Sequence, residues 1–410
     1  MGIVHPGEFI EDTQDHLNEL DLLADTAGGR VQAVHIQDRK KPDPAYYIGR
    51  GKAEEIALEA KAKGIDAVIF DDDLTPAQVK NLEKIIESKV LDRSTLILDI
   101  FARRAKTREA MTQVELAQLR HLLPRLTRRW THLSRQVGGI GTRGVGETQL
   151  EIDRRIIKNK IARLTKDLNK IERGRQERRK SRDSIFKVAI IGYTNAGKTS
   201  LFNAFTESHA FVQDRLFATL DSMVRRCILK GNNEILLIDT VGFIRKLPIP
   251  LIASFRSTLE ESVFADLLMN VIDLSNPNYE EHLAVTENIK LDLGIIDRPC
   301  LKVFNKIDLV EEGIIERARR LYPNALFVSA LKSQNLESIE RSIFTALNQV
   351  REEVDLYIDP RREDIIALVY RSGEVLEKTY VDGHVHIRFK GTKDKARQIQ
   401  HIVEMESACE

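Results

Sequence analysis

The segment from residue 192 to residue 200 has the residue types and spacing that hold the phosphates of a nucleotide. It reads GYTNAGKTS, matches the pattern GxxxxGK[ST] in full, and directly follows the apolar run Phe186–Ile191. Small residues let the backbone curl so that successive N–H groups point at the phosphates, and the positive end of the next helix adds attraction. The predicted phosphate-binding residues are Gly192, Tyr193, Thr194, Asn195, Ala196, Gly197, Lys198, Thr199 and Ser200. We expect Lys198 to reach the β- and γ-phosphates and the Thr199 hydroxyl to ligate Mg²⁺.

Two later motifs supply what a γ-phosphate sensor needs. The first is Phe217, Ala218, Thr219, Leu220 and Asp221, and the second, after the apolar run 234–238, is Asp239, Thr240, Val241 and Gly242. Thr219 is the candidate second magnesium ligand, as ordered switch segments provide. Asp239 is expected in the metal shell, and the Gly242 amide on the γ-phosphate. The predicted metal ligands are thus Thr199, Thr219 and Asp239, and the predicted catalytic residues are Lys198, Thr219 and Gly242.

Two neighbouring residues bear on the rate of hydrolysis. Phe243 and Ile244 follow the second motif, where some GTPases place a glutamine that orients the attacking water. Phenylalanine can make no such bond, so unaided hydrolysis is expected to be slow. Asn195 lies beside the phosphates, where its amide oxygen could hold K⁺ and supply transition-state charge. The alternative is that Asn195 only bonds the backbone of its own loop.

Base selectivity follows from two short segments near residues 305 and 330. They comprise Asn305, Lys306, Ile307 and Asp308 after the strand-like run 301–304, and Ser329, Ala330 and Leu331 after the run 325–328. The Asp308 carboxylate can accept from guanine N1–H and N2–H₂, and a backbone N–H of the second segment can donate to guanine O6. Adenine would leave these groups unpaired, at a cost of about 1 to 3 kcal/mol each. The sequence therefore predicts GTP rather than ATP as the substrate.

The whole chain has the length and composition of a multidomain protein. It has 410 residues, 42% hydrophobic and 30% charged, with a formal net charge of +1. A nucleic-acid partner must then be met by a local basic surface. Cys227, Cys300 and Cys409 form no CxxC pair, which argues against disulfides or zinc. The N-terminus resembles no secretion signal and no apolar run is long enough to span a membrane, so a cytoplasmic monomer is expected, with any membrane association peripheral and through a partner.

Residues 30 to 101 alternate strand-like and helical stretches, as a small α/β domain does. Strand-like runs at 31–36, 67–70 and 96–100 alternate with helical stretches near 51–63 and 75–87. The turn Gly49–Lys52 is basic and glycine-rich and could hold a phosphate. It fits no full phosphate-loop pattern, so a plain strand-to-helix turn is favoured.

Heptad-spaced apolar residues predict an antiparallel helical hairpin in the next segment. One series is Leu116, Leu119, Leu123, Leu126, Trp130, Leu133 and Val137, and the other is Ile157, Ile161, Leu164, Leu168 and Ile171. Pro124 should kink the first helix. The joining loop 138–147 is rich in glycine. Its basic surroundings favour RNA as a partner over a plain solvated helix face, and the predicted RNA contacts are Arg128, Arg129, Arg135 and Arg143.

The predicted fold class is a multidomain α/β protein with four parts. They are an N-terminal α/β domain (1–105), a basic helical hairpin (106–183), a P-loop GTPase domain with a mixed sheet flanked by helices (184–352), and a small α+β domain (353–410). For the last, the sequence indicates a strand at 354–358, a helix, a strand near 384–389 and a final helix.

Taken together, these motifs resemble the HflX family of ribosome-associated GTPases over about residues 20 to 400. The strings that carry the likeness include PDPAYYIGRGK, DIFARRAKTREA, GGIGTRGVGETQLE, GYTNAGKTSLFNAFT, FATLD, DTVGFI and NKID. The resemblance implies binding to rRNA in the large (50S) subunit or the 70S ribosome, stimulation of the GTPase by that partner, and splitting of stalled or idle ribosomes, notably under stress. Ser222 and Val145 stand where the family usually has proline, and neither changes an assigned role.

Two other functions remain compatible with these residues. The first is a GTPase that processes or modifies free RNA, although no methyl-donor, metal or nucleophile motif supports chemistry on RNA. The second is a signalling switch that binds only proteins through its heptads, and its turnover would be insensitive to RNA.

Overall fold

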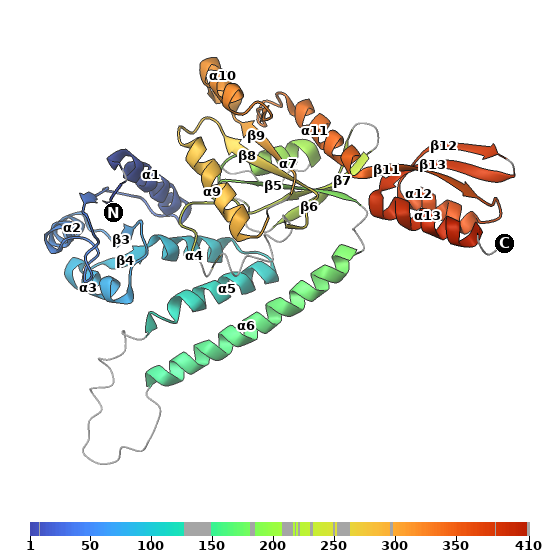
Figure 1. The fold of residues 1–410 in the computed structure, drawn as a ribbon. Helices are drawn as coiled ribbons and strands as arrows, with labels where there is room; N and C mark the ends of the chain where they lie inside the picture. Colours follow the sequence, from blue (N-terminus) through green and yellow to red (C-terminus); the bar gives the residue numbers. More distant parts are fainter. Residues whose placement is uncertain are drawn as a thin grey trace, which may run out of the picture.

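The computed structural model describes residues 1–7, 9–126, 149–180, 185–206, 216–217, 219, 222–229, 233–248, 251, 263–295, 298–381 and 383–407. Figure 1 shows an N-terminal α/β unit beside a central sheet, a pair of long helices running along both, and a small unit at the C-terminal end. The predicted fold class, a multidomain α/β chain with a mixed sheet flanked by helices and a small C-terminal α+β unit, is confirmed.

The N-terminal unit alternates short parallel strands with helices. Its elements are β1 (Gly2–Val4), α1 (Ile10–Thr26), β2 (Ile36–Asp38), α2 (Arg50–Lys63), β3 (Ala67–Phe70), α3 (Pro76–Ile86), β4 (Lys89–Asp92) and α4 (Arg93–Arg104). β1 pairs with β2 and β3 pairs with β4, both in parallel. The ammonium of Met1 donates to the Ile69 carbonyl at 2.8 Å, and the Asp71 amide donates to the Met1 carbonyl at 3.0 Å. These two bonds connect β1 to the free edge of β3.

Two of the strands expected in this unit are not where the sequence predicted them. The run 96–100 lies inside helix α4, and the expected strand 31–36 is replaced by β2, which begins at Ile36. Asp92 decides the first case: its carboxylate accepts from the Thr95 amide at 2.9 Å and so caps a helix N-terminus. A short apolar run is compatible with a buried strand and with part of a buried helix, because the side chains are apolar in both cases. Gly49 is the N-cap residue of α2, and its amide donates to Oε1 of Gln37 at 2.9 Å.

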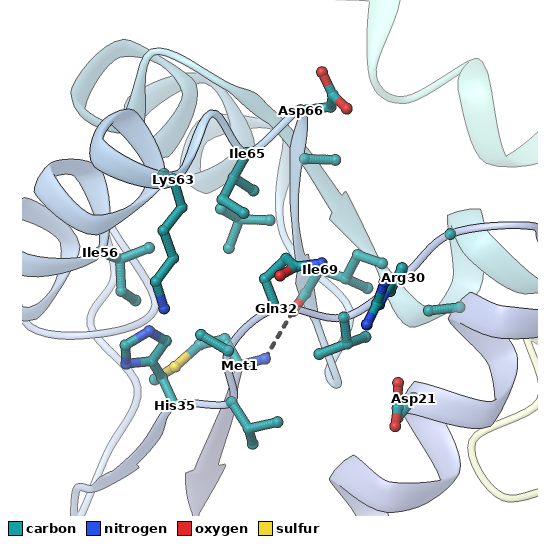
Figure 2. A pocket seen from close by; sticks show the side chains of 18 of the residues that line it. Met1, Asp21, Arg30, Gln32, His35, Ile56, Lys63, Ile65, Asp66 and Ile69 are labelled. Atoms are coloured by element: carbon teal, nitrogen blue, oxygen red, sulfur yellow. Dashed lines mark hydrogen bonds between the residues drawn. The ribbon is translucent and has the colours of Figure 1, made fainter.

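A cavity of about 670 Å³ opens in the N-terminal unit beside β3. Figure 2 shows it between Met1, the extended segment that carries Arg30 and Gln32, and the α2 side chains Ile56 and Lys63. None of the predicted nucleotide-binding residues lines it. The polar groups on one wall satisfy one another, because Glu59 of α2 pairs with His35 at 2.8 Å and with Lys63 at 2.6 Å.

The helical hairpin is built from α5 (Arg108–Leu122) and α6 (Gln149–Lys180). The two helices lie side by side in Figure 1, and a salt bridge from Lys160 to Glu115 joins them. The second predicted seam is present: Ile157, Ile161, Leu164, Leu168 and Ile171 are all half-buried on α6. The expected kink at Pro124 is wrong, because α5 ends at Leu122. Leu123 still has helical backbone and its amide donates to the Leu119 carbonyl at 2.9 Å, but Pro124 has no N–H to donate to the next carbonyl, so the helix stops there. The predicted tip loop 138–147 lies outside the described residues.

The central sheet has six strands in the order β10-β9-β8-β5-β7-β6, and only β6 is antiparallel to its neighbour. The strands are β5 (Phe186–Gly192), β6 (Met223–Leu229), β7 (Asn233–Asp239), β8 (Leu267–Asp273), β9 (Cys300–Asn305) and β10 (Leu326–Phe327). The flanking elements are α7 (Lys198–Thr206), α9 (Tyr279–Asp292), the short 3₁₀ helix η2 (Ile307–Leu309), α10 (Glu312–Leu321) and α11 (Leu336–Gln349).

Alternation along β5 separates two cores. Val188 and Ile190 face one side, where they pack with residues of α7 and α11, while Ala189 and Ile191 face the other side with residues of α9. Successive side chains of a strand point to opposite faces, so a run that is apolar at every position is buried on both. This arrangement places the carboxyl ends of β5, β7 and β9 at one edge, where the predicted nucleotide motifs begin.

The C-terminal unit is a three-stranded antiparallel sheet in the order β11-β13-β12, with two helices. Its elements are β11 (Arg351–Ile358), α12 (Glu363–Ser372), β12 (Glu374–Val381), β13 (His384–Thr392) and α13 (Lys393–Ser407). The expected α+β character is confirmed. Strand β12 was missed, because most of its side chains are exposed and it lacks an apolar alternation that would reveal it.

None of the helices in the described parts of the chain is both long and apolar enough to cross a membrane.

Candidate nucleotide-binding site

The predicted phosphate loop joins β5 to α7 and is fastened to the segment that follows β7. The Thr194 amide donates to the Phe243 carbonyl at 2.7 Å, and the Phe243 amide donates to the Gly192 carbonyl at 3.0 Å. The structure therefore brings together two motifs that lie about 45 residues apart in the sequence. Phe243 itself is 2% exposed. Its ring is part of the core and cannot orient a water molecule.

Two glycines of the loop are required by geometry. Gly197 has a φ of +91°, and a Cβ there would lie 2.2 Å from the Asn305 amide nitrogen. Gly192 has a φ of +140°, and its Cβ would lie 2.2 Å from the Val271 carbonyl oxygen. Only glycine tolerates both the backbone conformation and the close approach. The pattern GxxxxGK[ST] thus has a steric cause at each of its two glycines.

Lys198 is the buried cation of the site. It is 6% exposed, and its Nζ donates to the Tyr193 carbonyl at 2.6 Å. Burial lowers the pKa of Lys198 to about 8, and the nearby Asp239 carboxylate only partly offsets that effect. The backbone of Gly242 passes so close that a Cβ there would lie 2.9 Å from Nζ. Lys198 and Gly242, two of the three residues predicted to be catalytic, are therefore adjacent.

The three predicted metal ligands meet at the end of β7. The Thr199 and Thr219 hydroxyls are 2.7 Å apart, and they donate to Oδ2 of Asp239 at 2.9 and 3.2 Å respectively. Asp239 is fully buried, and burial raises the pKa of its carboxyl despite Lys198 and the two hydroxyls. Its other oxygen, Oδ1, is buried and has no hydrogen-bond partner among the described residues.

This group of oxygens fits Mg²⁺. Magnesium prefers one or two carboxylates together with hydroxyl, water and phosphate oxygens. A cation here would satisfy the free oxygen of Asp239 and remove the penalty for burying its charge. Lys198 would stand on the phosphate side of the ion.

The predicted base-recognition segments meet around Asn305. Its side chain accepts from the Ala330 amide at 2.9 Å and donates to the Ala196 carbonyl at 2.9 Å, so it links the phosphate loop to the segment after β10. Lys306 has a φ of +65° and pairs with Asp273 at 2.7 Å. Asp308, in η2, is half-buried, and its carboxylate makes no hydrogen bond or ion pair with another side chain in the described part of the chain. Its carboxylate is available to a ligand.

The remaining predicted residues are placed as follows. Asn195 is exposed at the top of the phosphate loop with a φ of +60°. Ser329 is fully buried, whereas Leu331 is 80% exposed. Ala218, Leu220 and Asp221, and the predicted RNA contacts Arg128, Arg129, Arg135 and Arg143, lie outside the described residues.

Sequence reasoning missed the contact between this site and the N-terminal unit. Tyr193 of the phosphate loop donates its hydroxyl to Glu19 of α1 at 2.5 Å and accepts from the Arg245 amide at 2.9 Å. Its ring stacks on His282, with ring centroids 3.7 Å apart. Burial, followed by the charge of Glu19, raises the pKa of the Tyr193 hydroxyl. A tyrosine at a variable position of the motif gives no sequence signal of this kind.

Charged residues continue the same contact. Lys246 pairs with Asp71 at 2.6 Å and with Asp72 at 2.5 Å, both just after β3. Arg93, 1% exposed at the start of α4, bonds to Asp71 at 2.8 Å and also to Glu19. Burial alone would raise the pKa of Asp71, yet Arg93 and Lys246 together lower it. The segment after Gly242 is thus tied to the N-terminal unit by the exposed Lys246, which compensates the charge of the buried Asp71.

Three family models match consecutive parts of the chain. They are the GTP-binding GTPase N-terminal family at residues 14–102, the GTP-binding GTPase middle region at residues 104–182, and the 50S ribosome-binding GTPase family at residues 187–306.

Curated relatives match over most of their length. The GTPase HflX of Flavobacterium psychrophilum is 43% identical over 89% of this chain and 94% of that protein. The GTPase HflX of Escherichia coli is 42% identical over 93% of this chain and 90% of its own. Among solved structures, a GTP-binding protein of the archaeon Sulfolobus solfataricus in complex with GDP is 28% identical, with coverage of 85% and 98% and a TM-score of 0.42.

Proposed function

The chain belongs to the HflX family of GTPases, and on that premise we propose that it acts on the ribosome. In this proposal it binds rRNA of the 50S subunit or the 70S particle and separates stalled or idle ribosomes, with GTP binding and hydrolysis as the timer. The observation that carries the proposal is that the N-terminal, middle and GTPase parts all match family models, over residues 14–102, 104–182 and 187–306, and that a relative named GTPase HflX matches 93% of the chain. The proposal places the protein in the cytoplasm, where its partner is.

The domain roles in this proposal follow the parts of the fold. Residues 1–105 and the hairpin 106–183 contact the ribosome, and residues 184–352 bind and hydrolyse GTP. Helix α6 has 32 residues and so extends about 48 Å. A hairpin of that length can carry its glycine-rich loop, with Arg143, far from the nucleotide.

The proposed chemistry of the site uses each residue for one task. Lys198 and the amides of the phosphate loop neutralise the β- and γ-phosphates, while Asp308 selects guanine. Thr199, Thr219 and Asp239 hold Mg²⁺, which when bound offsets the charge that develops on the phosphate oxygens. The Gly242 amide donates to the γ-phosphate.

The group that positions the attacking water is proposed to come from the partner. Phe243 is buried and has no polar atom on its side chain. A free enzyme built in this way turns over slowly. It gains rate when another surface orders the water, and removal of one such positioned group typically changes a rate by about 100-fold or more.

The test is GTP hydrolysis by the purified chain, alone and with 30S, 50S or 70S particles, in potassium buffer. Strong stimulation by 50S or 70S but not by 30S supports the proposal. Sedimentation of 70S particles with the protein and GTP then shows whether they separate into subunits. Stimulation by free rRNA alone would favour a GTPase of free RNA, and no stimulation by any RNA would favour a protein-binding switch.

A potassium requirement is proposed for Asn195. Asn195 is exposed on the phosphate loop with a φ of +60°, and its side-chain amide oxygen is a group that can ligate a monovalent ion beside the phosphates. Replacing K⁺ with Na⁺ at equal ionic strength should then slow hydrolysis in the wild type. Equal rates in the two salts would mean that Asn195 serves only the loop backbone.

A further inference from the structure

Helix α4 of the N-terminal unit touches the segment that carries Thr219. Phe101, 1% exposed on α4, packs edge-on against Phe217, with ring centroids 4.6 Å apart and an interplanar angle of 67°. One turn later, Nη1 of Arg104 donates to the Phe217 carbonyl at 2.7 Å. Both residues belong to the DIFARRA string, for which the nucleotide motifs provide no role.

Phe217 is held in a conformation that it would not adopt unaided. Its φ is +56°, in the left-handed region, and it is 2% exposed. For a residue with a Cβ this conformation costs on the order of one kcal/mol or more, and it persists only where the surroundings fix it. The hydrophobic core that surrounds Phe217 is made largely by α1, α4 and α5 of the preceding parts of the chain, together with Tyr193 and Val241.

The consequence of this conformation lies two residues further along. Thr219 places its hydroxyl 2.7 Å from that of Thr199 and 3.2 Å from Asp239. Phe217 is fixed in one conformation and its carbonyl is hydrogen-bonded. This limits the positions that Thr219, two residues later, can occupy relative to Thr199 and Asp239. Arg104 is half-buried, and a hydrogen bond from a charged guanidinium is among the stronger hydrogen bonds in proteins.

We propose that Phe101 and Arg104 are positioning residues for GTP hydrolysis, which fix Phe217 and thereby place Thr219 at the magnesium site. The inference rests on the proposed role of Thr219 as a magnesium ligand, but not on the ribosome as partner. In this arrangement the GTPase domain is incomplete on its own. Its switch segment is built partly by the N-terminal unit.

The second switch segment is held by the same unit, which supports the inference. Lys246 lies four residues after Gly242 and is bonded to Asp71 and Asp72. The segment that carries Thr219 and the segment after Gly242 therefore both contact the N-terminal unit. If the N-terminal unit moved away from the GTPase domain, both segments would lose these contacts together.

The experiment compares Arg104→Ala and Arg104→Lys with the wild type in the full chain and without ribosomes. Arg103→Ala is the matched control, because the bonds of Arg103 to described residues lie within the N-terminal unit, to the Ala27 carbonyl and to Asp99, both at 2.9 Å. Measurements are single-turnover GTP hydrolysis across a magnesium titration, affinity for GDP, and the melting temperature. Phe101→Leu is a second variant that keeps the core apolar.

The expected result is a loss of about 10- to 100-fold in the hydrolysis rate of Arg104→Ala at limiting magnesium, as for a lost charged hydrogen bond. The magnesium concentration for half-maximal rate rises, while GDP affinity changes less than threefold. Arg104→Lys keeps a donor and recovers part of the rate, Phe101→Leu shows a smaller loss of the same kind, and Arg103→Ala matches the wild type.

Two outcomes would overturn the inference. One is an unchanged rate and magnesium dependence in Arg104→Ala. The other is a fall in melting temperature with equal weakening of GDP and GTP binding, which would make Arg104 a purely structural contact. Because no ribosomes are present, either result is independent of whether 50S or 70S particles stimulate the wild type.

Discussion

Binding of a guanine nucleotide should be accompanied by uptake of a proton at Lys198. In the nucleotide-free chain the buried ammonium has a pKa of about 8. At pH 8.5 about three quarters of the molecules then carry a neutral lysine, against about one tenth at pH 7. A nucleotide phosphate beside Nζ favours the charged form and restores the pKa above that pH. GDP should therefore bind with uptake of roughly 0.7 proton at pH 8.5 and about 0.1 at pH 7.

The same linkage fixes the sign of the pH dependence of affinity. The bound state requires the protonated lysine, so affinity is greatest below the pKa of the free protein and falls as pH rises through it. From pH 7 to pH 9 the dissociation constant for GDP should rise about tenfold, equivalent to about 1.4 kcal/mol. GDP itself gains and loses little charge over this interval, because its phosphates are already ionised.

The assay is isothermal titration calorimetry of GDP at each pH in two buffers that differ in heat of ionisation. The difference in apparent enthalpy gives the protons taken up. Guanosine is the control ligand, since it occupies the base site without placing charge next to Lys198. Lys198→Arg is the control variant, because guanidinium stays charged throughout this range.

The reasoning would be refuted by proton uptake that is the same at pH 7 and pH 8.5. It would also fail if guanosine took up as many protons as GDP, since the titrating group would then lie near the base. Uptake that persists in Lys198→Arg at the wild-type level would assign the proton to another residue.

Three further predictions concern sterics, base choice and the interdomain contact. Gly197→Ala places a Cβ 2.2 Å from the Asn305 amide nitrogen at a positive φ, so nucleotide affinity should fall by more than about tenfold in a fluorescent-GDP titration. Asp308→Asn should weaken GTP by about 10- to 100-fold and improve xanthosine triphosphate, measured by competition. Lys246→Ala leaves the buried Asp71 to Arg93 alone and should lower the free energy of unfolding by about 2 kcal/mol in urea.

Each of these has a result that would count against it. Normal GDP binding by Gly197→Ala would mean that the loop can move away from Asn305. An unchanged preference for GTP in Asp308→Asn would remove that carboxylate from base recognition. For Lys246→Ala the control is Lys63→Ala, a half-exposed lysine bonded to Glu59, which should change stability by less than about 0.5 kcal/mol. Equal effects of the two would mean that the burial of Asp71 adds nothing to its pair with Lys246.

Sequence patterns predicted the elements of the helical hairpin and the N-terminal unit less well than those of the nucleotide site. The predicted heptad series on α6 is confirmed: its residues are half-buried along one face, because the spacing of the apolar residues matches the period of the helix. The predicted strand at 96–100 is wrong. A run that is apolar at nearly every position shows neither the strand period nor the helix period, and Asp92 caps a helix at this point. Pro124 ended a helix rather than bending one, and the sequence offers no means of choosing between the two.

The sequence by itself determined the chemistry of the nucleotide site. Each motif is short and follows a strand, so Lys198 and Asp239 had to gather where parallel strands end, whatever the remainder of the chain did. Only the tertiary structure decided what surrounds that site. Glu19 reaches Tyr193 across 174 positions, and Arg104 reaches Phe217 across 113. Contacts between parts so distant in the chain depend on how two folded units pack. Their side chains are ordinary at each position, so no local pattern records the pairing.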